Sequence, residues 1–317
     1  MVKRISKWLL RRLFANSKVR TFFKQELSKT EPLLSNQQLK VAPPGHYDCP
    51  LPDISVLDSS LHDHYTAPNG ADGISLNPDG QLRLLGELAP FAAEFDWPSD
   101  QRAERRFWLN NGRWYTGGDP VILFSMIRRF APRRIVEVGS GFSSALMLDI
   151  NELYYNSSIQ LTFVEPDPGR LTSLLRPEDR RIINLITKRV QNISLDLFDS
   201  LAPNDILLID SPHVTKLGSA VNYLMFSVLP RLQPGVLVHF HDIFYPFEYP
   251  PEWFRQGRAW NVLYLLRAFL QYNNAFEIVF FNSYIAYQYP DQVRRKVPLM
   301  SVDPYSAIWL SKTDVRQ

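Results

Sequence analysis

The chain has 317 residues, of which 45% are hydrophobic and 21% are charged, and its formal net charge is +3. These proportions are ordinary for a globular protein that buries a core, and they exclude a disordered chain. The small net charge gives no indication of a nucleic-acid partner. Cys49 is the single cysteine, so no disulfide can form within the chain, and we expect a reducing, cytoplasmic location.

The N-terminal segment, residues 1–29, is basic and contains a single acidic residue, Glu26. Arg11 and Arg12 interrupt the apolar stretch that a signal peptide would need, so we expect no secretion. Its apolar residues can form a stripe on a helix, and a basic aromatic helix suits an anionic membrane surface. We favour a helix that packs on its own domain or on a partner subunit. Peripheral membrane contact and a homo-oligomer are both compatible with this segment.

Proline residues and Asn-Gly and Asp-Gly pairs make residues 31–77 irregular. The spacing of leucines then predicts a helix from Pro78 to Ala93, with Asn77 as its N-cap. A second helix is predicted to begin at Asp119-Pro120. There the aspartate caps free N–H groups, and the proline takes the first helical position.

The most informative stretch is Arg134 to Ser144, RIVEVGSGFSS. Its β-branched run predicts a strand that is buried on both faces, and a helix is predicted from Ser143 to Leu153. Gly139 and Gly141 lie between the two elements. A helix N-terminus carries unpaired N–H groups, and glycine lets a ligand approach the backbone closely. The stretch therefore predicts a ligand site.

Further strands are predicted along the rest of the chain, separated by helical segments, which favours a doubly wound parallel sheet. Helices are expected at residues 217–232 and 259–270. The expected strands are 160–164, 184–190, 206–209 and 236–240, followed by 276–287 and 306–310. Ligands of such sheets bind at the carboxyl ends of the strands. The residues at those ends are Gly139, Glu165, Gln191, Asp210 and His241.

Glu165 follows the second predicted strand directly. The two oxygens of a carboxylate at this place can accept both hydroxyls of a ribose. A dinucleotide fingerprint would need glycine where Ser144 stands. Glu137-x-Gly139-x-Gly141 instead resembles motif I of the class I S-adenosylmethionine (SAM)-dependent methyltransferases.

This resemblance extends from Tyr115 to Lys312 and implies a Rossmann-like, mostly parallel seven-stranded sheet whose last strand is antiparallel. It implies a methyltransferase domain at residues 113–317, which follows an N-terminal extension of residues 1–112. SAM is the implied cofactor. The implied cofactor contacts are Tyr115, Glu137, Gly139, Ser140, Gly141, Ser143, Glu165, Gln191 and Asp210.

The segments LLIDSPH and VLVHFHD resemble those of small-molecule and sugar O-methyltransferases, some of which hold a divalent metal. A metal here would use Asp210, His241 and Asp242, but magnesium prefers oxygen ligands to imidazole. We therefore favour a metal-free site. In it, His213 or His241 is the general base and an aspartate orients the base.

We thus expect in-line methyl transfer to an oxygen or nitrogen of a small molecule or a glycan precursor. The aromatic, proline-rich stretch of residues 242–260 is expected to shape the acceptor pocket. Two alternatives remain. One is an NAD(P)-dependent oxidoreductase, against which Ser144 argues, and the other is a catalytically silent protein of the same fold. No nucleic-acid substrate is expected, because Asp210-Ser211-Pro212-His213 stands in place of an (Asn/Asp)-Pro-Pro-(Tyr/Phe) motif.

Overall fold

The computed structural model describes residues 46, 48–51, 71–112, 114–301 and 306–314. The chain divides into two compact units, Met1–Asp58 and Ser59–Gln317. The predicted basic helix within residues 1–29 lies outside the described residues. Within the described part of the chain, no helix has both the length and the apolar character that a membrane crossing requires.

A seven-stranded sheet forms the centre of this unit, with the strand order β3-β2-β1-β4-β5-β7-β6. Its strands are β1 (Arg134–Val138), β2 (Gln160–Val164), β3 (Ile183–Ile186), β4 (Ile206–Ile209), β5 (Leu237–His241), β6 (Phe276–Phe281) and β7 (Ala307–Lys312). The first five strands pair in parallel, and β7 is antiparallel to both β5 and β6. The predicted mostly parallel, doubly wound sheet with an antiparallel last strand is confirmed.

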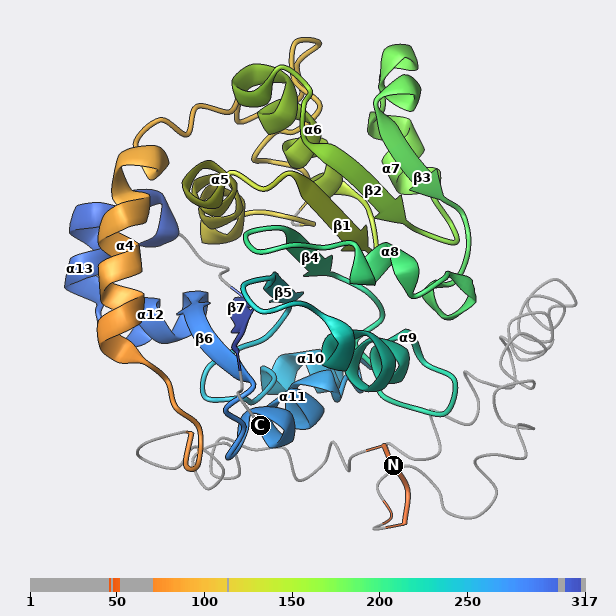
Figure 1. Ribbon diagram of the computed structural model, residues 1–317. Helices are drawn as coiled ribbons and strands as arrows, with labels where there is room; N and C mark the ends of the chain where they lie inside the picture. The colour runs from red at the N-terminus through yellow and green to blue at the C-terminus, as the bar shows by residue number, and fades with distance from the viewer. Residues whose placement is uncertain (1–45, 47, 52–70, 113, 302–305, 315–317) are drawn as a thin grey trace, which may run out of the picture. The chain divides into compact units, whose positions relative to one another are not determined.

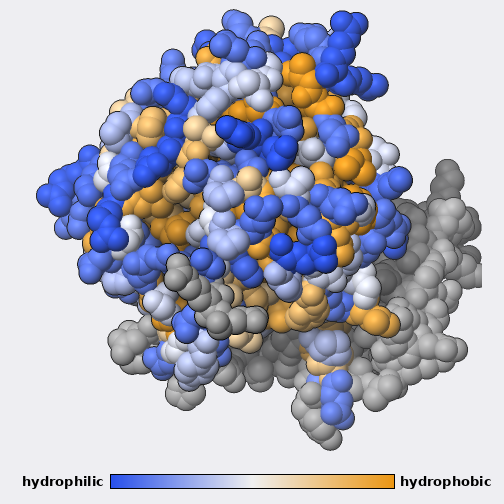
Figure 2. Space-filling model, viewed as in Figure 1, coloured by the Kyte–Doolittle hydropathy of each residue, from blue (hydrophilic) through white to orange (hydrophobic). Residues whose placement is uncertain are grey.

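Helices cover both faces of the sheet, with α5 and α6 on one face and α9 and α11 on the other (Figure 1). The helices are α4 (Pro78–Ala92), α5 (Gly118–Phe130), α6 (Phe142–Tyr155), α7 (Gly169–Leu174), α8 (Asp196–Asp199), α9 (Ala220–Tyr223), α10 (Pro251–Arg255), α11 (Val262–Leu270), α12 (Asn282–Gln288) and α13 (Pro290–Lys296). Because both faces are covered, every residue of the central strand β4 is buried. The outer surface is mostly hydrophilic on the side seen in Figure 2.

Helix α4 begins as predicted, because the Asn77 side chain accepts a hydrogen bond from Gly80 N at 3.2 Å. The helix contacts α5 and β6, so it packs on the sheet domain. The predicted boundary after residue 112 stays a prediction.

The predicted capping role of Asp119 is wrong. Helix α5 begins at Gly118, and the Asp119 carboxylate is buried. It accepts hydrogen bonds from Ser306 N at 2.9 Å and from Asn282 Nδ2 at 2.6 Å. Both donors come from segments distant in sequence, so tertiary hydrogen bonds replace the local cap.

Three predicted element boundaries are also corrected. Strand β3 ends at Ile186, and a short 3-10 turn at Val190–Asn192 follows it. The predicted strand 276–287 divides into β6 and α12, because only Phe276–Phe281 pair with β7. The predicted helix 217–232 begins at Ala220, changes to a π-helix at Leu224–Val228 and ends in a 3-10 turn.

Candidate active site

A cavity of ≈ 510 Å³ opens at the carboxyl ends of β1, β2, β4 and β5. It is lined by most of the residues that the sequence predicted to act: Tyr115, Gly139, Ser140, Gly141, Ser143, Glu165, Asp210, His213, His241 and Asp242. It is also lined by Trp114, Asp119, Arg170 and Ser211, which were not predicted to contact a ligand, and by Arg258 and Trp260 from the stretch 242–260 that was expected to shape the acceptor pocket. Glu137 and Gln191 are not among the lining residues.

The glycine turn after β1 fits closely against the end of β4. Gly139 has a φ of +89°, and a Cβ atom on it would lie 1.9 Å from the carbonyl oxygen of Asp210. Its N–H donates to Val164 O at 3.0 Å, and Asp210 N donates to Val138 O at 2.9 Å. A side chain at residue 139 would therefore push the ends of β1 and β4 apart. Because residue 139 has no side chain, the glycine turn and Asp210 line one cavity.

Glu165 is held beside the same turn by backbone donors. Its Oε2 accepts from Ser140 N at 3.1 Å, and its Oε1 accepts from Asp167 N at 2.9 Å. A carboxylate has about four acceptor positions, so these two bonds leave capacity for ligand hydroxyls. The backbone fixes the direction of the carboxylate before any ligand arrives.

Glu137 lies under the turn and is buried. Its carboxylate accepts hydrogen bonds from the hydroxyls of Ser143 and Ser144 at the start of α6. Burial raises its pKa to about 8, an effect that these hydroxyls partly offset. Ser144 Oγ also accepts a hydrogen bond from Gly141 N at 3.0 Å. Glu137 is therefore connected to the glycine turn through Ser144.

Gln191 lies on the 3-10 turn after β3. Its side-chain amide donates to Gly218 O at 2.8 Å. The residue therefore connects this turn to the loop after β4 and does not line the cavity.

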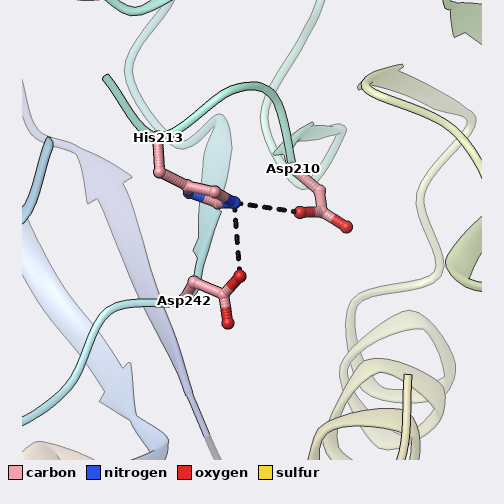
Figure 3. Close-up of side chains that lie close together, drawn as sticks. All are labelled: Asp210, His213 and Asp242. Atoms are coloured by element: carbon pink, nitrogen blue, oxygen red, sulfur yellow. Dashed lines mark ion pairs between the residues drawn. The ribbon is translucent and has the colours of Figure 1, made fainter. Parts of the chain in front are cut away.

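His213, Asp210 and Asp242 form a polar group in the cavity wall (Figure 3). His213 Nε2 lies 3.2 Å from Asp242 Oδ2 and 3.6 Å from Asp210 Oδ1. His213 is largely buried, and burial lowers its pKa, although both carboxylates oppose that shift. The imidazole is therefore neutral near pH 7 and lies beside two carboxylates that would stabilise its protonated form.

His241 is the last residue of β5 and behaves differently. Burial would lower its pKa, but the carboxylates of Asp210, Asp242, Asp119 and Glu137 outweigh burial and raise it. Its Nε2 lies 4.0 Å from Asp242 Oδ1. Asp242 follows the strand end and has a φ of +56°. This break in the strand geometry lets both side chains face one cavity, which continued alternation along a strand would prevent.

The ligand atoms of Asp210, His213 and Asp242 all lie within 4.8 Å of one another, so these three residues could hold a metal ion. The histidine of this group is His213, whereas the sequence predicted His241. Two carboxylate oxygens and one imidazole nitrogen suit manganese, iron or zinc better than magnesium.

Within the described part of the chain, four buried polar atoms of the cavity walls have no hydrogen-bond partner. They are Tyr115 Oη, Ser140 Oγ, Ser211 Oγ and His241 Nδ1. A buried polar group without a partner costs about 1–3 kcal/mol. Their concentration in one cavity indicates a polar ligand that supplies the missing partners.

An aromatic wall lies beside His213. The ring of Trp260 lies 4.2 Å from the His213 ring, and Trp253 packs on Trp260 at 5.1 Å. His213 O accepts from the N–H groups of Asn261 and Val262, at 3.0 and 3.2 Å. The start of α11 therefore fixes the position of the histidine loop.

Comparisons with known proteins identify the domain. Residues 136–243 match the family model of a methyltransferase domain. An uncharacterized protein of Archaeoglobus fulgidus is 32% identical over 176 residues, which are 53% of this chain and 76% of that protein.

Two solved structures are also similar. The SAH-bound Podospora anserina methyltransferase PaMTH1 is 13% identical with a TM-score of 0.41, over 81% of this chain and 97% of that chain. The O-methyltransferase TomG from Streptomyces achromogenes, in complex with SAM, is 13% identical with a TM-score of 0.35, over 80% of this chain and 96% of that chain. On the family match and the sheet topology, the chain belongs to the class I SAM-dependent methyltransferases.

Proposed function

We propose that this protein transfers the methyl group of SAM to an oxygen, or less favourably a nitrogen, of a small molecule or glycan precursor. One observation carries the proposal. A single cavity contains a bare glycine turn with the Glu165 carboxylate and, on another wall, His213 with two aspartates. The first group suits a nucleoside, and the second suits removal of a proton from an acceptor.

At the cofactor wall, Glu165 accepts the two ribose hydroxyls, because its oxygens are already oriented by Ser140 N and Asp167 N. The backbone of Gly139 and Gly141 lies under the amino-acid and ribose portions. Ser140 Oγ and Tyr115 Oη, which lack partners, bind polar groups of the same ligand. SAM supplies a methyl group on a sulfonium, which leaves as a neutral thioether.

At the acceptor wall, His213 is the general base. We assign the proton of the neutral ring to Nε2, where Asp242 Oδ2 accepts it at 3.2 Å. Nδ1 then takes the proton of the acceptor hydroxyl as the new O–CH₃ bond forms and the S–CH₃ bond breaks. Asp242 and Asp210 stabilise the imidazolium that results. His241 is the weaker choice of base, because its raised pKa favours the protonated form.

A metal-assisted variant uses the same residues. Asp210, His213 and Asp242 would hold a divalent ion, which would lower the pKa of an acceptor hydroxyl. We favour the metal-free form, because a base with a depressed pKa beside two carboxylates already serves this step. The two variants differ in their response to a chelator.

Calorimetric titration of the full chain with S-adenosylhomocysteine (SAH), NAD and NADP tests the proposal. We expect SAH to bind and both nicotinamide cofactors to fail. Binding of NAD without SAH would support the oxidoreductase alternative instead. SAH release from SAM in the presence of pooled hydroxylated acceptors then separates an enzyme from a silent binding protein. Activity that survives exhaustive chelation excludes the metal-assisted variant.

A further inference from the structure

Arg258 is an arginine of the cavity wall that lies against two indole rings. Its guanidinium carbon lies 4.8 Å from the ring centroid of Trp253 and 5.5 Å from that of Trp260. Among the described residues, no carboxylate forms a salt bridge with it. Its neighbour Arg255, in contrast, pairs with Glu252 at 3.7 Å. An arginine placed on indole faces keeps its planar donors available for a ligand.

The backbone holds Arg258 in this place. Arg258 N donates to Trp253 O at 2.8 Å, and Gly257 N donates to Phe254 O at 2.9 Å. The chain after α10 therefore folds back on the helix and directs residue 258 to the indole rings. Although the Arg258 side chain is exposed, these contacts restrict its position before an acceptor binds.

Trp260 connects this guanidinium to the reacting group. The centroid of its ring lies 4.2 Å from that of the His213 ring, and the Arg258 guanidinium carbon lies 5.5 Å from the Trp260 centroid. A ring compound that packs on Trp260 can therefore present a hydroxyl to His213 and a second substituent to Arg258.

The charges of the cavity determine the character of that substituent. Asp119, Glu165, Asp210 and Asp242 all line the cavity, and their carboxylates repel an anion. The other lining arginine, Arg170, lies over Trp114 at 3.8 Å and beside Gly141, at the cofactor turn. Arg258 is thus the lining arginine on the side of His213 and Trp260.

We propose that the methyl acceptor is an anion, a hydroxylated ring compound with a carboxylate or phosphate group that pairs with Arg258. The inference rests on the proposed function and narrows its substrate class. Arginine binds either group through two parallel N–H donors, so the structure favours their shared chemistry. The carboxylate or phosphate makes the acceptor specific, and His213 receives the proton of its hydroxyl.

Calorimetry on the SAH-loaded full chain tests this inference with benzoate, phenyl phosphate and benzyl alcohol as probes. We expect at least one of the two anions to bind about tenfold or more tightly than the uncharged alcohol, since one charge-assisted pair supplies that difference. Whichever anion binds better identifies the carboxylate or the phosphate as the group. Arg258→Gln should abolish the preference.

The matched control is Arg255→Gln, which removes the same charge from α10 without changing a residue of the cavity wall. It should leave the anion preference unchanged. SAH affinity, measured for each variant, reports separately on the proposed function and on correct folding. If SAH binds normally but neither anion binds more tightly than benzyl alcohol, or if Arg258→Gln keeps the preference, the inference is overturned while the methyltransferase assignment stands.

Discussion

Nε2 of His213 lies 3.2 Å from Oδ2 of Asp242, although the two residues follow different strands of the sheet. The parallel order of β4 and β5 brings both strand ends to one edge, where Asp210 completes the group. This relationship gives a neutral imidazole two carboxylate neighbours. The proposed removal of the acceptor proton by His213 depends on these two carboxylates.

Replacing His213 tests the base directly. We expect His213→Ala to lower kcat about 10²–10⁴-fold, the usual contribution of a general base, with SAH affinity unchanged. In the wild type, a base must be deprotonated, and burial lowers the His213 pKa below 6.5. The rate should therefore rise with pH through a value below 6.5 and then stay level. His46→Ala is the control. Full activity of His213→Ala would exclude His213 as the general base.

Asp242→Asn tests how the carboxylate acts. Asp242 raises the His213 pKa, so its removal should move the acid limb of the pH–rate profile to lower pH. The maximal rate should also fall, because the imidazolium loses its partner. Asp291→Asn, an exposed substitution, serves as the control. An acid limb that stays in place would indicate that Asp242 acts by another route, such as metal binding.

Glu165→Gln tests the ribose contact. Loss of a charge-assisted hydrogen-bond acceptor costs about 1.5–3 kcal/mol, which corresponds to an increase of about 10–100-fold in the Kd of SAH. Asp167→Asn changes an exposed neighbouring carboxylate and keeps the backbone N–H that orients Glu165. Calorimetry should find that control close to wild type. Equal affinities for the two variants would contradict the assignment.

Gly139→Ala tests the contact between the two strand ends. The new Cβ would lie 1.9 Å from Asp210 O, so we expect a loss of about 4 kcal/mol or more in the free energy of unfolding. Gly257→Ala is the control, because Gly257 has a similar φ of +84° but an added Cβ would have no heavy atom within 4 Å. It should cost only about 1–2 kcal/mol, the cost of a left-handed backbone. Urea denaturation measures both, and equal losses would show that the backbone angle alone matters.

Glu137→Gln tests the buried carboxyl. Its pKa is raised from 4.5 to about 8, so between these values the folded state holds a proton that the unfolded state has lost. The group therefore destabilises the fold increasingly as the pH rises from 4.5 to about 8. The stability of Glu137→Gln relative to wild type should increase over this range and level off above it. A difference between Glu137→Gln and the wild type that stays constant from pH 4.5 to about 8 would exclude the raised pKa.

The central strands could be predicted because their information is local. The boundaries predicted for β2 and β4 agree with the structure, since a short run of branched apolar residues suits only a strand that is buried on both faces. Strand β6 was predicted too long, because its end depends on where β7 stops pairing and on the hydrogen bond from Asn282 to Asp119. Neither partner is visible from residues 276–287 alone.

Part of the site could be predicted from the order of strands and helices alone. Alternation of strands and helices already brings Gly139, Glu165 and Asp210 to one edge, and these three do line the cavity. Gln191 was chosen by the same rule, but its amide is bound to Gly218 O. The stretch 242–260 was expected to shape the acceptor pocket, but Arg258 was not chosen from it, because only the folded loop brings Arg258 to two indole rings.

The sequence by itself determined the sheet, the glycine turn and the acid after the second strand, because each follows from short-range preferences of the backbone. Only the tertiary structure decided which histidine lies between two aspartates, where Asp119 directs its carboxylate, and which arginine lines the cavity beside two indole rings. The physical reason is that charge, burial and hydrogen bonding at a site depend on distances across strands. Those distances are set when the whole sheet packs.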